Sequence, residues 1–154
     1  IIDTGAGISE RIQMFMRSAD DLLVITMPDP SAITDAYATI KIASKNIKNI
    51  GIILNQVSSK KEAMSVFEKI KKVATLNLDP SLTLEYIGKM NIDPNIAKSV
   101  KQRLLFAKEF PSSASSKDLE RIAKQISKKL ERNVLVPKEE SGLNGFMRRL
   151  MENF

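Results

Sequence analysis

Short apolar runs alternate with segments of helical periodicity along most of this chain. The runs at 22–27 and 50–54 are apolar almost throughout, which is typical of strands buried on both faces of a parallel sheet. A third strand is predicted at 84–90, and Ile1-Ile2 resembles the end of another. A loop rich in serine is expected over 106–116. The spacing of apolar residues predicts helices over about 10–18, 30–44, 59–75, 95–103, 117–131 and 143–153.

This alternation predicts a doubly wound α/β fold, with a mostly parallel sheet and helices on both faces. Ligands of such sheets bind outside the carboxyl ends of the strands, where the chain turns from strand to helix. Four segments follow predicted strand ends and are expected to meet at one edge of the sheet: 3–5, 27–28, 55–56 and 90–93.

The pattern divides the chain into three parts. Residues 1–132 carry the α/β alternation, 133–142 form a polar linker, and 143–154 form a short amphipathic helix. Because the first residues resemble the end of a strand, we expect the 154 residues to be the C-terminal part of a longer domain that is truncated at its N-terminus.

Composition excludes several kinds of chemistry. The chain has no Cys and no His, so thiolate nucleophiles, Ser-His-Asp catalysis and imidazole or thiolate metal sites are absent from it. Carboxylates, Lys, Arg, hydroxyls and backbone amides remain, and with a hard cation such as Mg²⁺ they are the groups of phosphate chemistry. The net charge of +6 is uneven, since residues 1–100 hold 12 basic and 11 acidic side chains but 101–154 hold 12 and 7. The basic tail favours an anionic partner.

The first candidate site is Asp3-Thr4-Gly5-Ala6-Gly7. An aspartate at the end of a buried strand can hold a Mg²⁺-bound water, and the glycines after it let the backbone approach a γ-phosphate. The same residues also suit a plain strand-to-helix turn, in which glycine supplies a positive φ and aspartate accepts loop amides.

With the residues that follow, this segment resembles the Walker B and switch II region of the MinD/ParA family of deviant Walker ATPases. The stretch 26–41, with its two prolines, is similar to the branch of that family that regulates flagellar number and placement, FlhG (also called FleN or YlxH). Asn55-Gln56-Val57 before a Lys-rich helix, and Leu84-Glu85-Tyr86-Ile87-Gly88 before a short loop, resemble the same branch. The similarity extends over about 1–130.

The resemblance implies roles for individual residues. Asp3 matches the catalytic Walker B carboxylate, which acts on Mg²⁺ through a bound water, and Gly5 and Gly7 match the switch glycines. Asn55 matches the asparagine whose amide pairs with the adenine edge, a role that suits its donor and acceptor. From the residues alone, Asn55 is equally a turn residue that starts a helix.

The loop that contains Ile92 and Asp93 matches a segment that lies against the nucleotide base. Members of the family often carry a proline just before this loop, where this chain has Met90-Asn91. Because of this difference, the detailed contacts of 91–93 with the base do not follow from the resemblance.

The resemblance also implies what the intact protein does. The family's phosphate-binding loop precedes the Walker B strand, and nothing in 1–154 matches it. The intact parent is therefore expected to bind ATP and Mg²⁺, to hydrolyse ATP and to form an ATP-dependent homodimer, whereas residues 1–154 alone are predicted to be inactive. An FlhF-type GTPase is the expected protein partner.

The last predicted helix is amphipathic. Arg148 and Arg149 flank its apolar arc, from where they can reach lipid phosphates. The pattern is typical of an interfacial membrane anchor, and it resembles the membrane-targeting helix of MinD-type proteins. A cytoplasmic protein bound peripherally to the inner face of the cell membrane is expected, and a helix folded back on its own domain is the alternative. The apolar residues of the arc are Leu143, Phe146, Met147, Leu150, Met151 and Phe154.

Two other functions stay open at this point. A ParA-like partitioning ATPase would bind DNA nonspecifically, and a non-catalytic interaction module would need no phosphate loop. DNA binding requires Lys and Arg along a groove-facing stripe, whereas the last helix is built from Phe, Met and Leu, so nucleic acid is disfavoured. The helix at 117–132 keeps the DNA alternative through its basic residues Lys117, Arg121, Lys124, Lys128 and Lys129.

Overall fold

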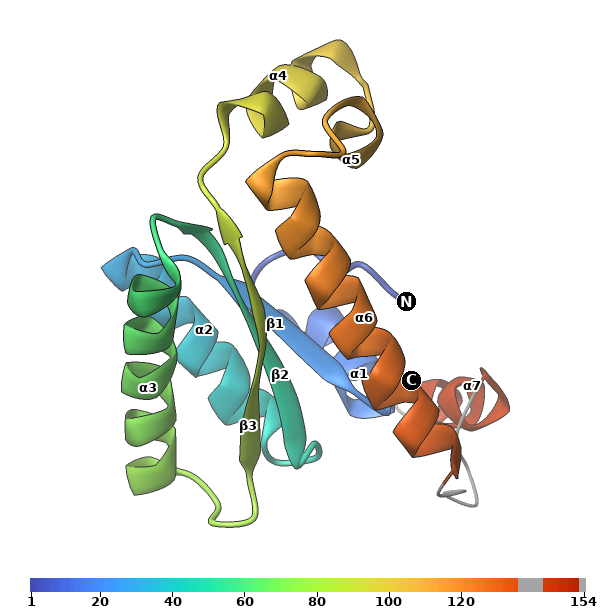
Figure 1. Ribbon diagram of the computed structural model, residues 1–154. Coiled ribbons are helices and arrows are strands. Elements are labelled where there is room, and N and C mark those ends of the chain that lie inside the picture. Colours follow the sequence, from blue (N-terminus) through green and yellow to red (C-terminus); the bar gives the residue numbers. More distant parts are fainter. Residues whose placement is uncertain (136–142, 153–154) are drawn as a thin grey trace.

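Three parallel strands form one sheet in the order β1-β2-β3 (Figure 1). The computed structural model describes residues 1–135 and 143–152. All pairings within the sheet are parallel, which confirms the predicted strand direction. The strands are β1 (Leu22–Thr26), β2 (Asn49–Val57) and β3 (Thr83–Asn91).

Helices follow each strand, as the alternation predicts. Local signals start them: the Asp29 carboxylate accepts the amides of Ser31 and Ala32 at the start of α2, and the Ser59 hydroxyl accepts the amide of Glu62 in α3. The helices are α1 (Glu10–Ser18), α2 (Pro30–Ala43), α3 (Lys60–Asn77), α4 (Pro94–Gln102), α5 (Phe106–Glu109), α6 (Ala114–Leu135) and α7 (Leu143–Met151).

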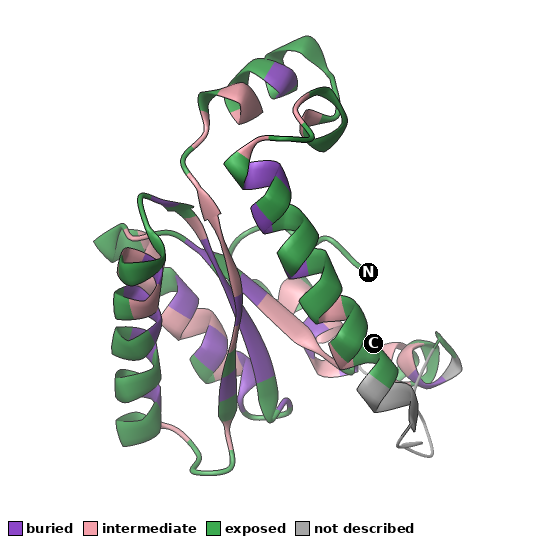
Figure 2. Cartoon of the chain, viewed as in Figure 1, coloured by how far each residue is buried: buried purple, intermediate pink, exposed green. Residues whose placement is uncertain are grey.

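The sheet is covered on both faces, which confirms the predicted α/β layering. On one face α1, α2 and α3 enclose the main core around β2, whose inward side chains are almost fully buried (Figure 2). On the other face α6 crosses β3, and Ile53, Ile87 and Ile122 form a smaller cluster. Both faces of β2 are therefore apolar, as its continuous apolar sequence requires.

The structure differs from the predicted elements at the N-terminus, in the serine-rich loop and at the ends of β2 and α6. Strand β2 continues past residue 54 to Val57, so it contains Asn55, which is predicted to follow it. Residues 1–2 form no strand in the part of the chain described, and Ile1 and Ile2 are exposed rather than paired in the sheet. The serine-rich loop is shorter than predicted because α5 lies within it and α6 begins at Ala114. Ser113 explains this early start, since its hydroxyl accepts the amide of Ser116 at 3.1 Å as an N-terminal cap.

The end of α6 also extends into the predicted linker. Helix α6 continues to Leu135, and residues 136–142 lie outside the described part of the chain. Across the described residues, no helix combines the length and the apolar character needed to cross a membrane.

Gly51 is required by the close packing of the central strand. A Cβ atom at this position would lie 2.6 Å from Leu23 Cδ2 and 2.8 Å from Ile87 Cγ1. We expect Gly51→Ala to lower the free energy of unfolding by about 1–3 kcal/mol, the usual effect of overpacking a core. Gly5→Ala is the matched control, because nothing lies within 4 Å of that position. Chemical denaturation of both variants makes the comparison, and equal stabilities would contradict the packing described.

Candidate functional site

The carboxyl end of β2 contains a bulge. The pairing with β3 shifts between Leu54 and Val57, so Asn55 and Gln56 lie opposite a single residue of β3. Gln56 has a φ of 54°, in the left-handed region that non-glycine residues seldom adopt. The Asn55 side chain accepts the Gln56 amide through Oδ1 at 2.9 Å. Bulges of this kind redirect side chains at functional edges of sheets, and this one sets Asn55 apart from the regular ladder.

The loop after β3 is joined to the same edge. The amide of Ile92 donates to the carbonyl of Val57 at 3.1 Å, two residues beyond Asn55. Ile92 is 68% exposed, and Asp93 caps α4 by accepting the amide of Asn95 at 2.9 Å. The structure thus brings Asn55 and the 91–93 loop together, as the parallel sheet predicts. Both α4 and α5 lie beyond this end of β3 (Figure 1).

A buried ionic cluster lies behind the 91–93 loop. Asp118 of α6 is only 4% exposed, and it accepts Lys89 Nζ at 2.6 Å and Arg121 Nη1 at 2.7 Å. Lys89 Nζ also donates to Asn91 Oδ1 at 2.8 Å. Burial, and secondarily the charge of Asp118, raise the pKa of the nearby Tyr86 phenol. These charges are mutually satisfied, so they hold α6 to the strand end in one geometry.

Sequence analysis does not find Lys89 and Asp118 as a pair. They are 29 residues apart and belong to different elements, so no local spacing connects them. The available signal is that Lys89 is one of two charged residues, with Glu85, in the predicted strand at 84–90, because a lysine in a strand that packs against a helix needs a partner.

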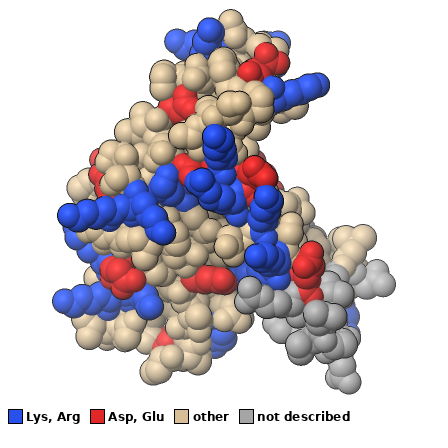
Figure 3. Space-filling model, viewed as in Figure 1, with Lys and Arg blue, Asp and Glu red and all other residues tan. Residues whose placement is uncertain are grey.

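Basic side chains gather over α3 and α6, on either side of β3 (Figure 3). Four of the α6 residues named for DNA binding are exposed, but Lys129 is not: it is 14% exposed and lies 3.4 Å from Asp21 and 3.6 Å from Glu85. The exposed basic stripe of α6 is therefore smaller than its sequence indicates. It consists of Lys117, Arg121, Lys124 and Lys128.

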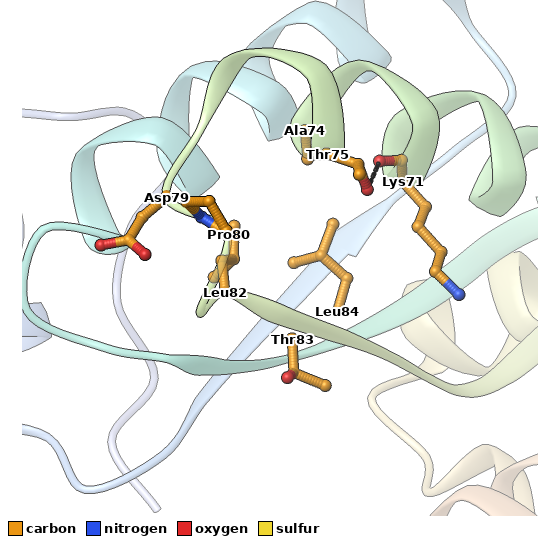
Figure 4. A pocket seen from close by; sticks show the side chains of 8 residues that line it. All are labelled: Lys71, Ala74, Thr75, Asp79, Pro80, Leu82, Thr83 and Leu84. Carbon is orange, nitrogen blue, oxygen red and sulfur yellow. Dashed lines mark hydrogen bonds between the residues drawn. The ribbon is translucent and has the colours of Figure 1, made fainter.

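A separate pocket of about 240 Å³ lies at the opposite, amino end of β3 (Figure 4). Its one carboxylate, Asp79, accepts Lys48 Nζ at 2.8 Å and the hydroxyl of Ser81 at 2.7 Å. The bond from Lys48, followed by those from Ser81, holds the pKa of Asp79 well below its ordinary value. This carboxylate is already satisfied, and the pocket is remote from the edge that carries Asn55. Its lining residues are Lys71, Ala74, Thr75, Asp79, Pro80, Leu82, Thr83 and Leu84.

Residues 1–9 do not form a site by themselves. Asp3, Gly5 and Gly7 are exposed in an irregular segment, and Gly7 has a φ of 108° that suits glycine. Among the residues described, no three acidic side chains come together as a metal site would require. The role of Asp3 at a Mg²⁺-bound water stays a prediction.

Helix α7 packs beside α1, at the side of the sheet away from α3 (Figure 1). Arg149 donates to the Ser18 carbonyl through Nε at 3.1 Å and through Nη2 at 3.0 Å, and Nη2 also lies 2.7 Å from Asp20 Oδ1. Arg148 pairs instead with Glu152 at 3.4 Å. This is the folded-back arrangement considered above as the alternative to an anchor.

The docking of α7 leaves part of its apolar arc uncovered. Phe146 and Leu150 are half-buried, whereas Leu143, Met147 and Met151 are exposed, at 74%, 46% and 72%. Phe154, which the sequence also assigns to the arc, lies outside the described residues. The membrane role of these residues stays a prediction.

The parallel sheet with helices on both faces is an α/β fold like that of P-loop NTPases. A solved structure of the cell-division ATPase MinD from Pyrococcus furiosus matches with a TM-score of 0.56 and 19% identity, covering 73% of this chain and 44% of that one. At this identity, the likeness concerns the fold. No family model matches the chain.

Two curated relatives show a more specific similarity than the fold does. The flagellum site-determining protein YlxH of Helicobacter pylori is 40% identical over 153 residues, which are 99% of this chain and 51% of that protein. The antiactivator FleN of Pseudomonas aeruginosa is 30% identical over 128 residues, covering 82% of this chain and 45% of that protein. The chain spans about half the length of these relatives. Over the part of these relatives that it matches, the chain is a MinD/ParA-type, FlhG-like protein.

The ionic cluster makes a direct prediction for stability. Asp118→Ala leaves Lys89, which is 15% exposed, without its carboxylate, and loss of one partner of a buried pair costs about 3–5 kcal/mol. Glu120→Ala on the same helix removes an exposed pair with Lys124, and solvent screening makes its contribution to stability far smaller. Urea denaturation of both variants measures the difference. An Asp118→Ala protein as stable as Glu120→Ala would show that the cluster does not hold α6 in place.

Proposed function

We propose that this chain supplies the base-binding edge and the membrane-responsive helix of an ATP-driven switch that regulates flagellar number or placement. The observation that carries the proposal is the joining of Asn55 and the 91–93 loop at one edge of the sheet, through the bond between Ile92 and Val57. An amide side chain set out of the ladder by a bulge can accept from and donate to the adenine edge. An exposed apolar residue such as Ile92 suits the face of the base.

ATP hydrolysis in this proposal belongs to the longer protein and not to residues 1–154. The chain matches about half of its relatives, and it contains no Gly-rich loop with lysines that would cradle phosphates. Asp3, Gly5 and Gly7 then complete a site whose phosphate loop and remaining Mg²⁺ contacts come from another segment. Bound Mg²⁺ would neutralise charge that develops on the phosphates. The role of Asp3 is to accept a hydrogen bond from a water of the metal, and the glycines allow their segment to move.

Helix α7 is the proposed readout of the switch. In the docked position Arg149 donates to the Ser18 carbonyl and to Asp20, while Leu143, Met147 and Met151 remain exposed. One short amphipathic helix binds a membrane weakly, and an ATP-dependent homodimer would present two of them, which raises the effective concentration at the surface. The exposed apolar residues and the flanking arginines favour an anionic membrane surface. An FlhF-type GTPase is the proposed protein partner.

A ParA-like activity on DNA is the second candidate, favoured by the exposed basic stripe of α6. A DNA shift by the full-length protein that weakens steeply with salt, and that persists without residues 142–154, would support this candidate over the membrane switch.

Base recognition is tested by Asn55→Ala in the full-length protein. We expect the affinity for a non-hydrolysable ATP analogue to fall on the order of tenfold, and the preference over the GTP analogue to shrink, because a site that hydrogen-bonds a base rejects one with the wrong edge. Asn46→Ala is the control, since Asn46 lies in the turn after α2, at the other end of the sheet. Titration calorimetry measures both affinities. Unchanged affinity and preference in Asn55→Ala would remove the proposed role of this edge.

Membrane binding is tested by placing a charge on the uncovered arc of α7. We expect Met147→Glu in the full-length protein to reduce ATP-dependent co-sedimentation with anionic vesicles severalfold, because a carboxylate opposes both insertion and attraction to the surface. Leu76→Glu serves as the control, since Leu76 is also an exposed apolar residue, at 73%, and lies on α3. Equal co-sedimentation of the two variants would overturn the anchor role of α7.

A further inference from the structure

The loop that faces the proposed base site is held from two sides by groups that the family resemblance does not include. On one side, Lys89 Nζ donates to the Asn91 side chain at 2.8 Å. On the other, the Ser115 hydroxyl of α6 donates to the Asn91 carbonyl at 3.3 Å. Both groups hold Asn91, the last residue of β3, immediately before Ile92. The orientation of Ile92 and Asp93 therefore depends on where α6 sits.

The side chain of Lys89 is held in place by two hydrogen bonds. Its ammonium group is fixed between Asn91 Oδ1 and the carboxylate of Asp118, 2.6 Å away, and both charged side chains are largely buried. Burying these charges costs desolvation energy that their attraction roughly offsets, so the net contribution of such a cluster to stability is small while its partners are intact. What the cluster supplies is a defined geometry, because the ammonium group donates to Asn91 and to Asp118 at the same time.

The approach of α6 to β3 is tight enough to transmit that geometry. A Cβ atom on Gly88 would lie 2.6 Å from Ile122 Cγ1, so the strand at this point is in direct contact with the helix. The position of Asp118, one turn before Ile122, is thereby fixed relative to the strand end. The bonds to Asn91 therefore restrain the chain where β3 passes into the loop.

We propose that Lys89, held by Asp118, is a positioning residue that sets the 91–93 loop against the nucleotide base and thereby determines the preference for adenine. The inference rests on the proposed function, since it assumes that this edge binds the base. Lys89 itself does not contact the nucleotide. It acts by fixing Asn91, and small displacements of positioning groups have large effects on binding and orientation.

The test compares base preference among variants of the full-length protein. In Lys89→Met, which keeps an apolar stem but loses the ammonium group, the ratio of affinities for the non-hydrolysable ATP and GTP analogues should fall on the order of tenfold. Lys89→Arg keeps the charge and should retain most of the preference. Lys124→Met removes the same charge from an exposed pair on α6 and should leave the ratio unchanged. The ratio separates a positioning role from general destabilisation, which would weaken both analogues alike.

Ser115→Ala provides a second measurement that does not disturb the ionic cluster. It removes only the bond to the Asn91 carbonyl, and we expect a drop in the ratio of about threefold, in the range of one neutral hydrogen bond. If Asn55→Ala lowers the preference for adenine while Lys89→Met and Ser115→Ala do not, the positioning role is overturned and the proposed function stands. If none of the three variants changes the ratio, the proposed function and this inference both fail.

Discussion

The contact between α6 and the end of β3 is the constraint on which the candidate site depends. Gly88 admits Ile122 directly onto the strand, and one turn earlier Asp118 draws in Lys89. The apolar contact favours close approach, whereas the ionic contact permits only one register of the helix along the strand. Without this contact, the loop at 91–93 would be connected to the sheet edge mainly by the bond between Ile92 and Val57.

The two ends of the sheet serve different purposes. At the carboxyl end, a bulge with Gln56 in a left-handed conformation costs backbone energy that a regular strand would not, and such strain is typically kept where it orients a functional group. At the amino end, Lys48 and Ser81 both donate to Asp79 and close the turn before β3. The well-formed pocket beside Asp79 is therefore a consequence of how α3 joins β3, and it has no unsatisfied carboxylate.

Much of the fold is accessible from the sequence, because burial on both faces makes a strand apolar at every position. This is why the run at 22–27 predicts β1 to within one residue, and why the run at 50–54 predicts the first part of β2, which continues to Val57. The start of α6 is harder, since the serines near 113 suit a loop as well as a helix cap, and the choice depends on the hydrogen bond from Ser116. The apolar arc of the last helix is equally clear in sequence. Its docking on α1 is not, because it depends on the Ser18 carbonyl and Asp20, about 130 residues away.

The candidate site, too, is predictable from the sequence only in part. Asn55 and 91–93 are predicted because both lie at the carboxyl ends of parallel strands, and their roles come from family resemblance. The bulge that redirects Asn55 depends on the register of β3, and the ionic cluster depends on α6, so neither leaves a local pattern in the sequence.

The central claim is that the carboxyl edge of the sheet binds the adenine base, and a crystal structure of the full-length protein with a bound ATP analogue tests it most directly. The account predicts the adenine amino group within about 3 Å of Asn55 Oδ1 and the ring against Ile92. A base bound elsewhere, with Asn55 free of it, would contradict the account.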